Sequence, residues 1–103
     1  MDERTVTERR DRAMEAARIL NSAVFRDALD AMDAQYVSAW RAAREQDERE
    51  HWWRMQNCVA TLRRELFREL QGAALRSGGK DGELCAALDE AKGRWKMCGG
   101  TAG

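Results

Sequence analysis

Two runs of apolar residues with helical spacing, on either side of a short polar segment, constrain the fold of this 103-residue chain most strongly. The runs lie in residues 23–44 and 48–76, and in each the apolar residues recur every three or four positions, which places them on one side of an α-helix. If the chain turns back at residues 45–47, apolar residues of the two runs face each other in successive layers. The facing pairs are Trp40–Trp52, Tyr36–Met55, Met32–Val59, Leu29–Leu62 and Phe25–Leu66. The sequence therefore predicts an all-α fold centred on an antiparallel helical hairpin, with these ten residues as its core.

Shorter segments flank the predicted hairpin. Thr5-Val6-Thr7-Glu8 has the form of a capping box, which predicts a short N-terminal helix that ends near Leu20. Residues 77–82 are rich in glycine and predict a flexible break. We expect a loosely attached amphipathic helix over residues 83–98 and a disordered tail over residues 99–103. Residues 1–76 would then form one helical domain, and the absence of proline from the whole chain agrees with a helical fold.

The composition excludes several classes of protein. Eighteen basic and eighteen acidic residues give a net charge of zero, which argues against a strongly basic nucleic-acid binder. Three cysteines without a close pair do not form a disulfide framework or a zinc site, and we interpret them as reduced thiols. The apolar runs are too short for a membrane span, and the N-terminus does not have the pattern of a signal peptide. We therefore expect a protein of the cytoplasm.

No pattern in the sequence predicts catalysis. The spacings typical of nucleophile elbows, zinc proteases, phosphate-binding loops and zinc fingers are all absent. His51 is the only histidine, and we interpret it as a surface or capping residue. The acidic ladder Asp27, Asp30 and Asp33 could offer oxygens to a hard cation, but such a ladder is more typical of a solvated helix face. We predict no catalytic residue, no cofactor and no metal site, and we do not expect an enzyme.

A second apolar stripe lies beside the main one on the second run. It consists of Trp53, Ala60, Phe67 and Ala74, which recur every seven residues. Exposure of both Trp53 and Phe67 would leave a sizeable apolar patch, so something must cover them. The cover could be the N-terminal helix, the C-terminal helix or a second copy of the chain. We predict a partner-binding face formed by Trp53, Ala60 and Phe67, with Arg64 and Arg68 at its rim.

The same region carries the densest basic cluster, which leaves two other functions open. Arg54, Arg63, Arg64 and Arg68 could contact phosphates in a packaging or regulatory DNA-binding protein. Glu65 and Glu69 interleave with them, however, and favour ion pairs within the helix. Inhibition of a host protein is a further alternative.

Residues 13–70 resemble small helical proteins encoded by tailed bacteriophages and prophages. The resemblance rests on scattered positions: Ala17-Arg18-Ile19-Leu20, Ser22, Phe25, Ala28-Leu29-Asp30, Tyr36, Trp40, Asp47, Trp53, Leu62-Arg63 and Leu66. It brings no catalytic residue with it, and the chain from Ser77 onward has no counterpart. Because many such proteins are encoded among head and packaging genes, the resemblance implies a role in the virion or its assembly. We therefore expect a non-enzymatic, phage-encoded interaction protein that self-associates or docks on a larger complex through the Trp53/Phe67 face.

Overall fold

The computed structural model describes residues 3–95, which form four helices without a strand. These are α1 (Glu3–Leu20), α2 (Ala23–Ala42), α3 (Gln46–Arg76) and α4 (Gly82–Trp95). The predicted all-α class is confirmed for this part of the chain. Ser22 caps α2, because its Oγ accepts a hydrogen bond of 3.2 Å from the backbone N–H of Phe25. The expected end of the last helix and the expected tail over residues 99–103 lie outside the described residues.

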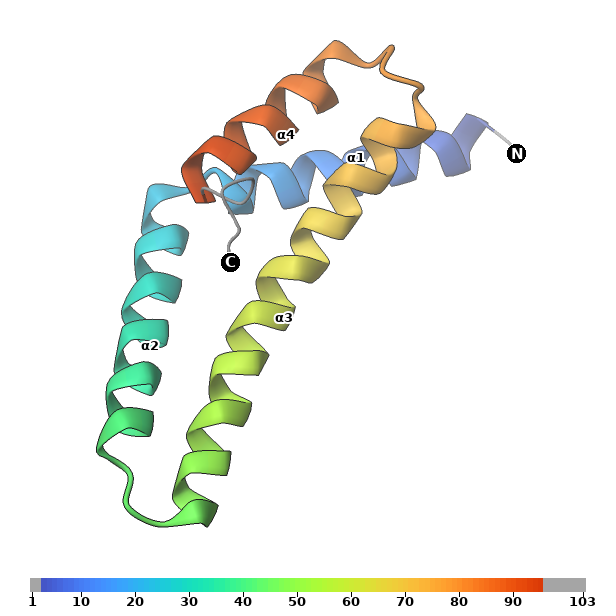
Figure 1. The fold of residues 1–103 in the computed structure, drawn as a ribbon. Coiled ribbons are helices and arrows are strands. Elements are labelled where there is room, and N and C mark those ends of the chain that lie inside the picture. Colours follow the sequence, from blue (N-terminus) through green and yellow to red (C-terminus); the bar gives the residue numbers. More distant parts are fainter. Residues whose placement is uncertain (1–2, 96–103) are drawn as a thin grey trace.

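The helix α3 forms the axis of the molecule (Figure 1). Its 31 residues correspond to about 46 Å, and the described part of the molecule measures 55 × 25 × 24 Å. The helices α1 and α4 lie against the C-terminal part of α3, while α2 runs beside its N-terminal part in the opposite direction (Figure 1). We call α1, α4 and residues 66–76 the head, and α2 with residues 46–65 the arm.

The hydrophobic core lies in the head. Small alanine side chains let the three helices approach closely around Leu20 and Leu70, which are fully buried. The cluster consists of Ala13, Ala17, Leu20, Phe67, Leu70, Ala73, Ala74, Leu84, Leu88 and Ala91. None of these is among the ten residues that the sequence analysis assigned to the core. The centre of the core therefore lies at the other end of α3 from the turn that joins α2 to α3.

The ten predicted core residues lie along the arm and at its junction with the head, and only two of them are buried. Leu29 and Val59 are buried, whereas Phe25, Tyr36, Trp52, Met55 and Leu66 are half-buried. The remaining three are exposed: Met32 and Trp40 to 39% and Leu62 to 47%. The prediction is wrong for these three. A pair of helices buries only the residues along its single line of contact, and side chains on either side of that line stay exposed to solvent.

The helix α4 packs into the head and is not loosely attached. Leu84, Leu88 and Ala91 turn into the core. The indole Nε1 of Trp95 donates a hydrogen bond of 2.8 Å to the carbonyl of Leu20, at the end of α1. Both ends of α4 are thus fixed, since its N-terminus is tied to α1 as well.

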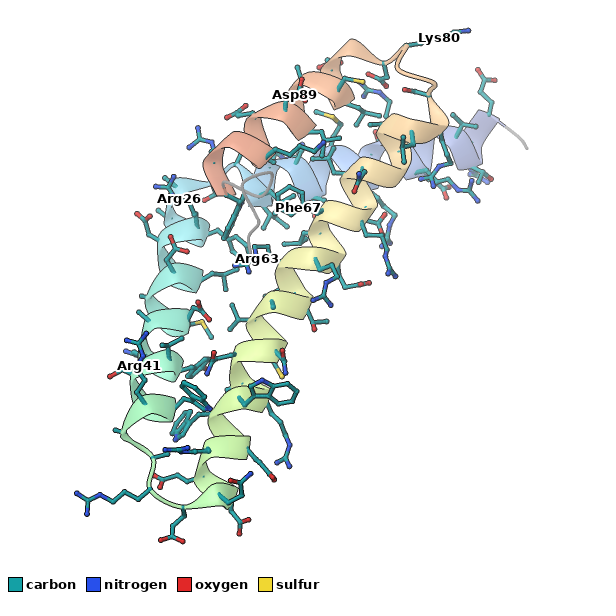
Figure 2. All side chains as sticks on the ribbon, viewed as in Figure 1. Arg26, Arg41, Arg63, Phe67, Lys80 and Asp89 are labelled. Atoms are coloured by element: carbon teal, nitrogen blue, oxygen red, sulfur yellow. The ribbon has the colours of Figure 1, made fainter. Side chains whose placement is uncertain are left out.

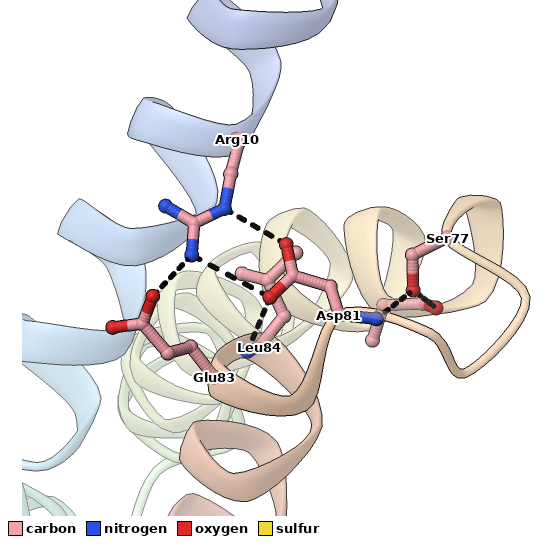
Figure 3. Close-up of polar contacts among 6 residues, drawn as sticks. Arg10, Ser77, Asp81, Glu83 and Leu84 are labelled. Atoms are coloured by element: carbon pink, nitrogen blue, oxygen red, sulfur yellow. Dashed lines mark hydrogen bonds and ion pairs between the residues drawn. The ribbon is translucent and has the colours of Figure 1, made fainter.

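That tie is an ion-pair network around Asp81 (Figure 3). Arg10 of α1 donates from Nε to Asp81 Oδ2 at 2.8 Å and from Nη2 to Glu83 Oε1 at 2.7 Å. Asp81 also caps α4, because its Oδ1 accepts a hydrogen bond of 3.3 Å from the N–H of Leu84. The hydrogen bond from Arg10 is the main cause that lowers the pKa of Asp81 below its ordinary value.

The connector between α3 and α4 is an ordered turn where the sequence predicted a flexible break. Gly78 and Gly79 adopt φ values of 66° and 80°, which favour glycine. The hydroxyl of Ser77 donates to the carbonyl of Ala74 at 2.7 Å and accepts from the N–H of Asp81 at 3.3 Å (Figure 3). These bonds lead the chain from α3 directly into the capping residue of α4.

The Asp81 network predicts a specific pH dependence of stability. Because the pKa of Asp81 is lower in the folded protein than its ordinary value of 3.8, its charge stabilises the fold above that value. This contribution is lost as the pH falls from there through the lowered pKa. The Asp81→Asn variant keeps the cap acceptor but cannot ionise, so its free energy of unfolding should lie below that of the wild type at neutral pH. Urea denaturation between about pH 6 and about pH 2 should show the difference shrinking toward acid, and a difference independent of pH would contradict this role of Asp81.

Candidate protein-binding surface

The five residues predicted to bind a partner lie on one side of α3. They are Trp53, Ala60, Arg64, Phe67 and Arg68, and their spacing by three, four and seven residues keeps them on neighbouring tracks of one helix. Their exposure differs greatly along the helix. Trp53 is 57% exposed and Ala60 is half-buried, while the two arginines are exposed. This side of α3 is called the α3 face below.

Phe67 does not belong to an exposed contact face. It is 7% exposed and lies in the head core with residues of α1 and α4 (Figure 2). The prediction is corrected because the chain itself covers Phe67, through the packing of α1 and α4 on α3. Trp53 lies 14 residues earlier, beyond the reach of both helices, and keeps its exposure.

A shallow groove of about 390 Å³ lies between α3 and α4, next to Phe67. It is lined by Arg64, Phe67, Arg68, Gln71, Gly72, Leu75 and Lys92. Three of these side chains are cationic and none is acidic, and Leu75 is 72% exposed. We call this feature the α3–α4 groove. It brings together three of the predicted residues, Arg64, Phe67 and Arg68.

Two residues of the groove, Leu75 and Lys92, were not predicted from the sequence. Leu75 lies eight residues after Phe67 and therefore falls outside the stripe that recurs every seven residues. Leu75 nevertheless lies on nearly the same side of α3 as Trp53, because 22 residues correspond to about six full helical turns. This spacing could have identified Leu75 from the sequence. Lys92 belongs to α4 and reaches the groove only through tertiary packing.

The predicted basic cluster does not form one free patch. Arg54 pairs with Glu50 at 3.4 Å, and Arg68 pairs with Glu65 at 3.6 Å. The guanidinium of Arg63 lies 5.5 Å from the ring centre of Trp95, in cation–π geometry. Within residues 3–95, Arg64 alone of the four has no such interaction.

The aromatic residues at the tip of the arm meet in a different register from the predicted one. Tyr36 stacks on Trp52 with ring centres 5.8 Å apart, where the sequence predicted that Trp40 faces Trp52. The connector covers residues 43–45 and not 45–47 as predicted, so the turn comes two residues earlier and the facing pairs shift. His51 packs edge-on against Trp52 at 4.7 Å. Trp52 is thus anchored in the arm, whereas the neighbouring Trp53 points to solvent.

The described residues offer no arrangement for metal binding. Within residues 3–95, no group of three or more histidine, cysteine or acidic side chains lies close enough to hold an ion. Asp27, the first residue of the acidic ladder, pairs with Arg26 at 3.2 Å. Cys58 and Cys85 carry free thiols, and Cys98 lies outside the described residues.

Comparison with protein-family models, curated proteins and solved structures finds no match to this chain. The resemblance to phage-encoded proteins therefore stays a prediction. None of the helices described here is both long and apolar enough to cross a membrane.

The two adjacent tryptophans of α3 should respond differently to truncation. Trp53→Ala removes an exposed side chain and should change the free energy of unfolding by less than about 0.5 kcal/mol. Trp52→Ala removes the stacking on Tyr36 and should cost about 2 kcal/mol or more. Urea denaturation followed by circular dichroism measures both. Equal losses for the two variants would show that Trp53 is covered within the monomer.

Proposed function

We propose that this chain is a non-enzymatic interaction protein that docks on another protein surface through its α3 face. In this proposal α2 and α3 form a helical hairpin that carries Trp53 away from the head. The observation that supports it is the exposure of two large apolar side chains, Trp53 and Leu75, on the same side of α3 as a groove with a cationic rim.

The chemistry of this face is typical of protein interfaces. Single exposed apolar residues are ordinary on protein surfaces, and Trp53 alone would carry no argument. Here the exposed Trp53 lies on the same side of α3 as a groove lined by Phe67 and the exposed Leu75, and Arg64 lies between Trp53 and Leu75 along the helix. Tryptophan and arginine dominate the residues that contribute most to binding at interfaces.

The biological setting is proposed on the resemblance alone. A phage-encoded protein of this kind would act in the cytoplasm of the host cell or in the virion, as part of an assembly complex. The three-helix head would supply stability, and the arm would extend the contact surface over the length of α3.

DNA binding is the second candidate, because the α3–α4 groove has three cations and no acid in its lining. Phosphate contacts need cations that are not already neutralised. Arg54 and Arg68 have glutamate partners and Arg63 is held by Trp95, which leaves few free charges. The same groove therefore supports a protein partner better than a nucleic acid.

Site-specific photocrosslinking tests this proposal. A photoreactive amino acid at position 53 or 75 should give adducts with protein when the chain is produced together with its neighbouring genes. The matched control is position 11, which is exposed on α1 away from the α3 face. Nuclease-sensitive adducts would favour the DNA-binding candidate, and no adduct at either position would contradict the proposal.

A further inference from the structure

Two apolar surfaces remain uncovered on opposite parts of the chain. Among the described large hydrophobic residues, Val24 and Leu75 are the most exposed, at 80% and 72%. Val24 begins the outer face of α2, the side away from α3. The other exposed residues of this face are Asp27, Ala28, Ala31, Ala34, Gln35, Ser38 and Ala42. Because Val24 keeps so much of its surface, the α3–α4 groove of its own chain does not cover it.

We propose that the α3–α4 groove binds the outer face of α2 from a second copy of this chain, so that copies join head to tail. This inference rests on the proposed function and names the partner of the same face. It places Val24 of one copy next to Phe67 and Leu75 of the other, which would cover the two most exposed apolar side chains together.

The charges of the two surfaces are complementary. The helix α2 contains three aspartates and two arginines, and Asp27 is the acidic residue on its outer face, whereas the groove is lined by three cations without an acid. Within residues 3–95, Arg64 and Lys92 have no ion-pair partner, and Asp27 on the outer face is 69% exposed despite its contact with Arg26. Packing α2 against its own copy would bring like charges together and leave the groove empty. Charge therefore favours α2 on the groove over α2 on α2.

The shape of the outer face suits a shallow groove. Apart from Val24, Asp27 and Gln35, its side chains are alanine and serine, which allow the helix axis to approach closely. One helix in one groove forms an interface below about 1,200 Å², a size typical of weak association. A contact between two different surfaces continues from copy to copy and produces a ring or an open chain of copies.

Two variants separate the two surfaces. The groove variant carries Arg64→Glu and Leu75→Glu, and the helix variant carries Val24→Lys and Asp27→Lys; all four positions are exposed, so the fold should persist. The control is Arg18→Glu, an exposed charge on α1 outside both surfaces. Circular dichroism should show the same helix content for all of them.

Sedimentation velocity then gives a decisive pattern. Wild type and the Arg18→Glu control should assemble beyond the dimer as concentration rises, and each surface variant alone should stay monomeric. An equimolar mixture should form a complex of twice the monomer mass and nothing larger. The groove variant still has an intact α2 face and the helix variant still has an intact groove, so each pair of variants can form only one contact.

Three results would overturn the inference: a wild type that stays monomeric at millimolar concentration, a surface variant that assembles alone, or a mixture that stays monomeric. A monomeric wild type whose position 53 or 75 crosslinks to a different protein would overturn only this inference. A monomeric wild type without any such adduct would overturn the proposed function as well.

Discussion

The packing of α1 and α4 on the last turns of α3 is the interaction on which the rest of the structure depends. The fully buried Leu20 and Leu70 lie there, surrounded by alanines of three helices. The arm has far less to hold it, since among its residues only Leu29 and Val59 are buried. A helix extends at little cost once its first turns are fixed. The head can therefore hold α3 along its length, and α2 then packs on a helix that already exists.

The same packing creates the candidate site. The α3–α4 groove exists only because α4 lies against α3, which brings Lys92 beside Phe67 and Arg64. The position of α4 depends in turn on Arg10 and Asp81 at one end and on the hydrogen bond from Trp95 to Leu20 at the other. Stability and binding are thus linked, because a change that released α4 would remove the groove and expose Phe67 at once.

The sequence predicts well where the helices of this protein lie along the chain, but it predicts poorly which helices pack against each other. Helical spacing and caps such as Ser22 locate the helices, and the spacing also shows that Trp53 and Phe67 share one side of α3. It does not show which helix covers which part of that side. Phe67 is 7% exposed and Trp53 is 57% exposed because α1 and α4 pack on one part of α3 and stop short of the other.

The register of the arm and the contribution of α4 to the groove could not be predicted from the sequence, for a related reason. The pairing of Tyr36 with Trp52 follows from a connector at residues 43–45, two residues earlier than predicted, which shifts α3 relative to α2. Lys92 joins Arg64 only through the docking of α4, which helical spacing within one segment cannot reveal. The capping function of Asp81 was likewise hidden in a segment that glycine content marked as flexible.

Hydrogen exchange at a concentration where the protein is monomeric tests most directly the claim that the head stabilises the arm. Amides of residues 13–20, 66–74 and 84–91 should exchange slowest, and those of α2 and residues 46–60 should exchange faster, through openings that leave the head intact. Equal protection of arm and head, or slower exchange in the arm, would contradict the account, because it would place the stabilising core between α2 and α3.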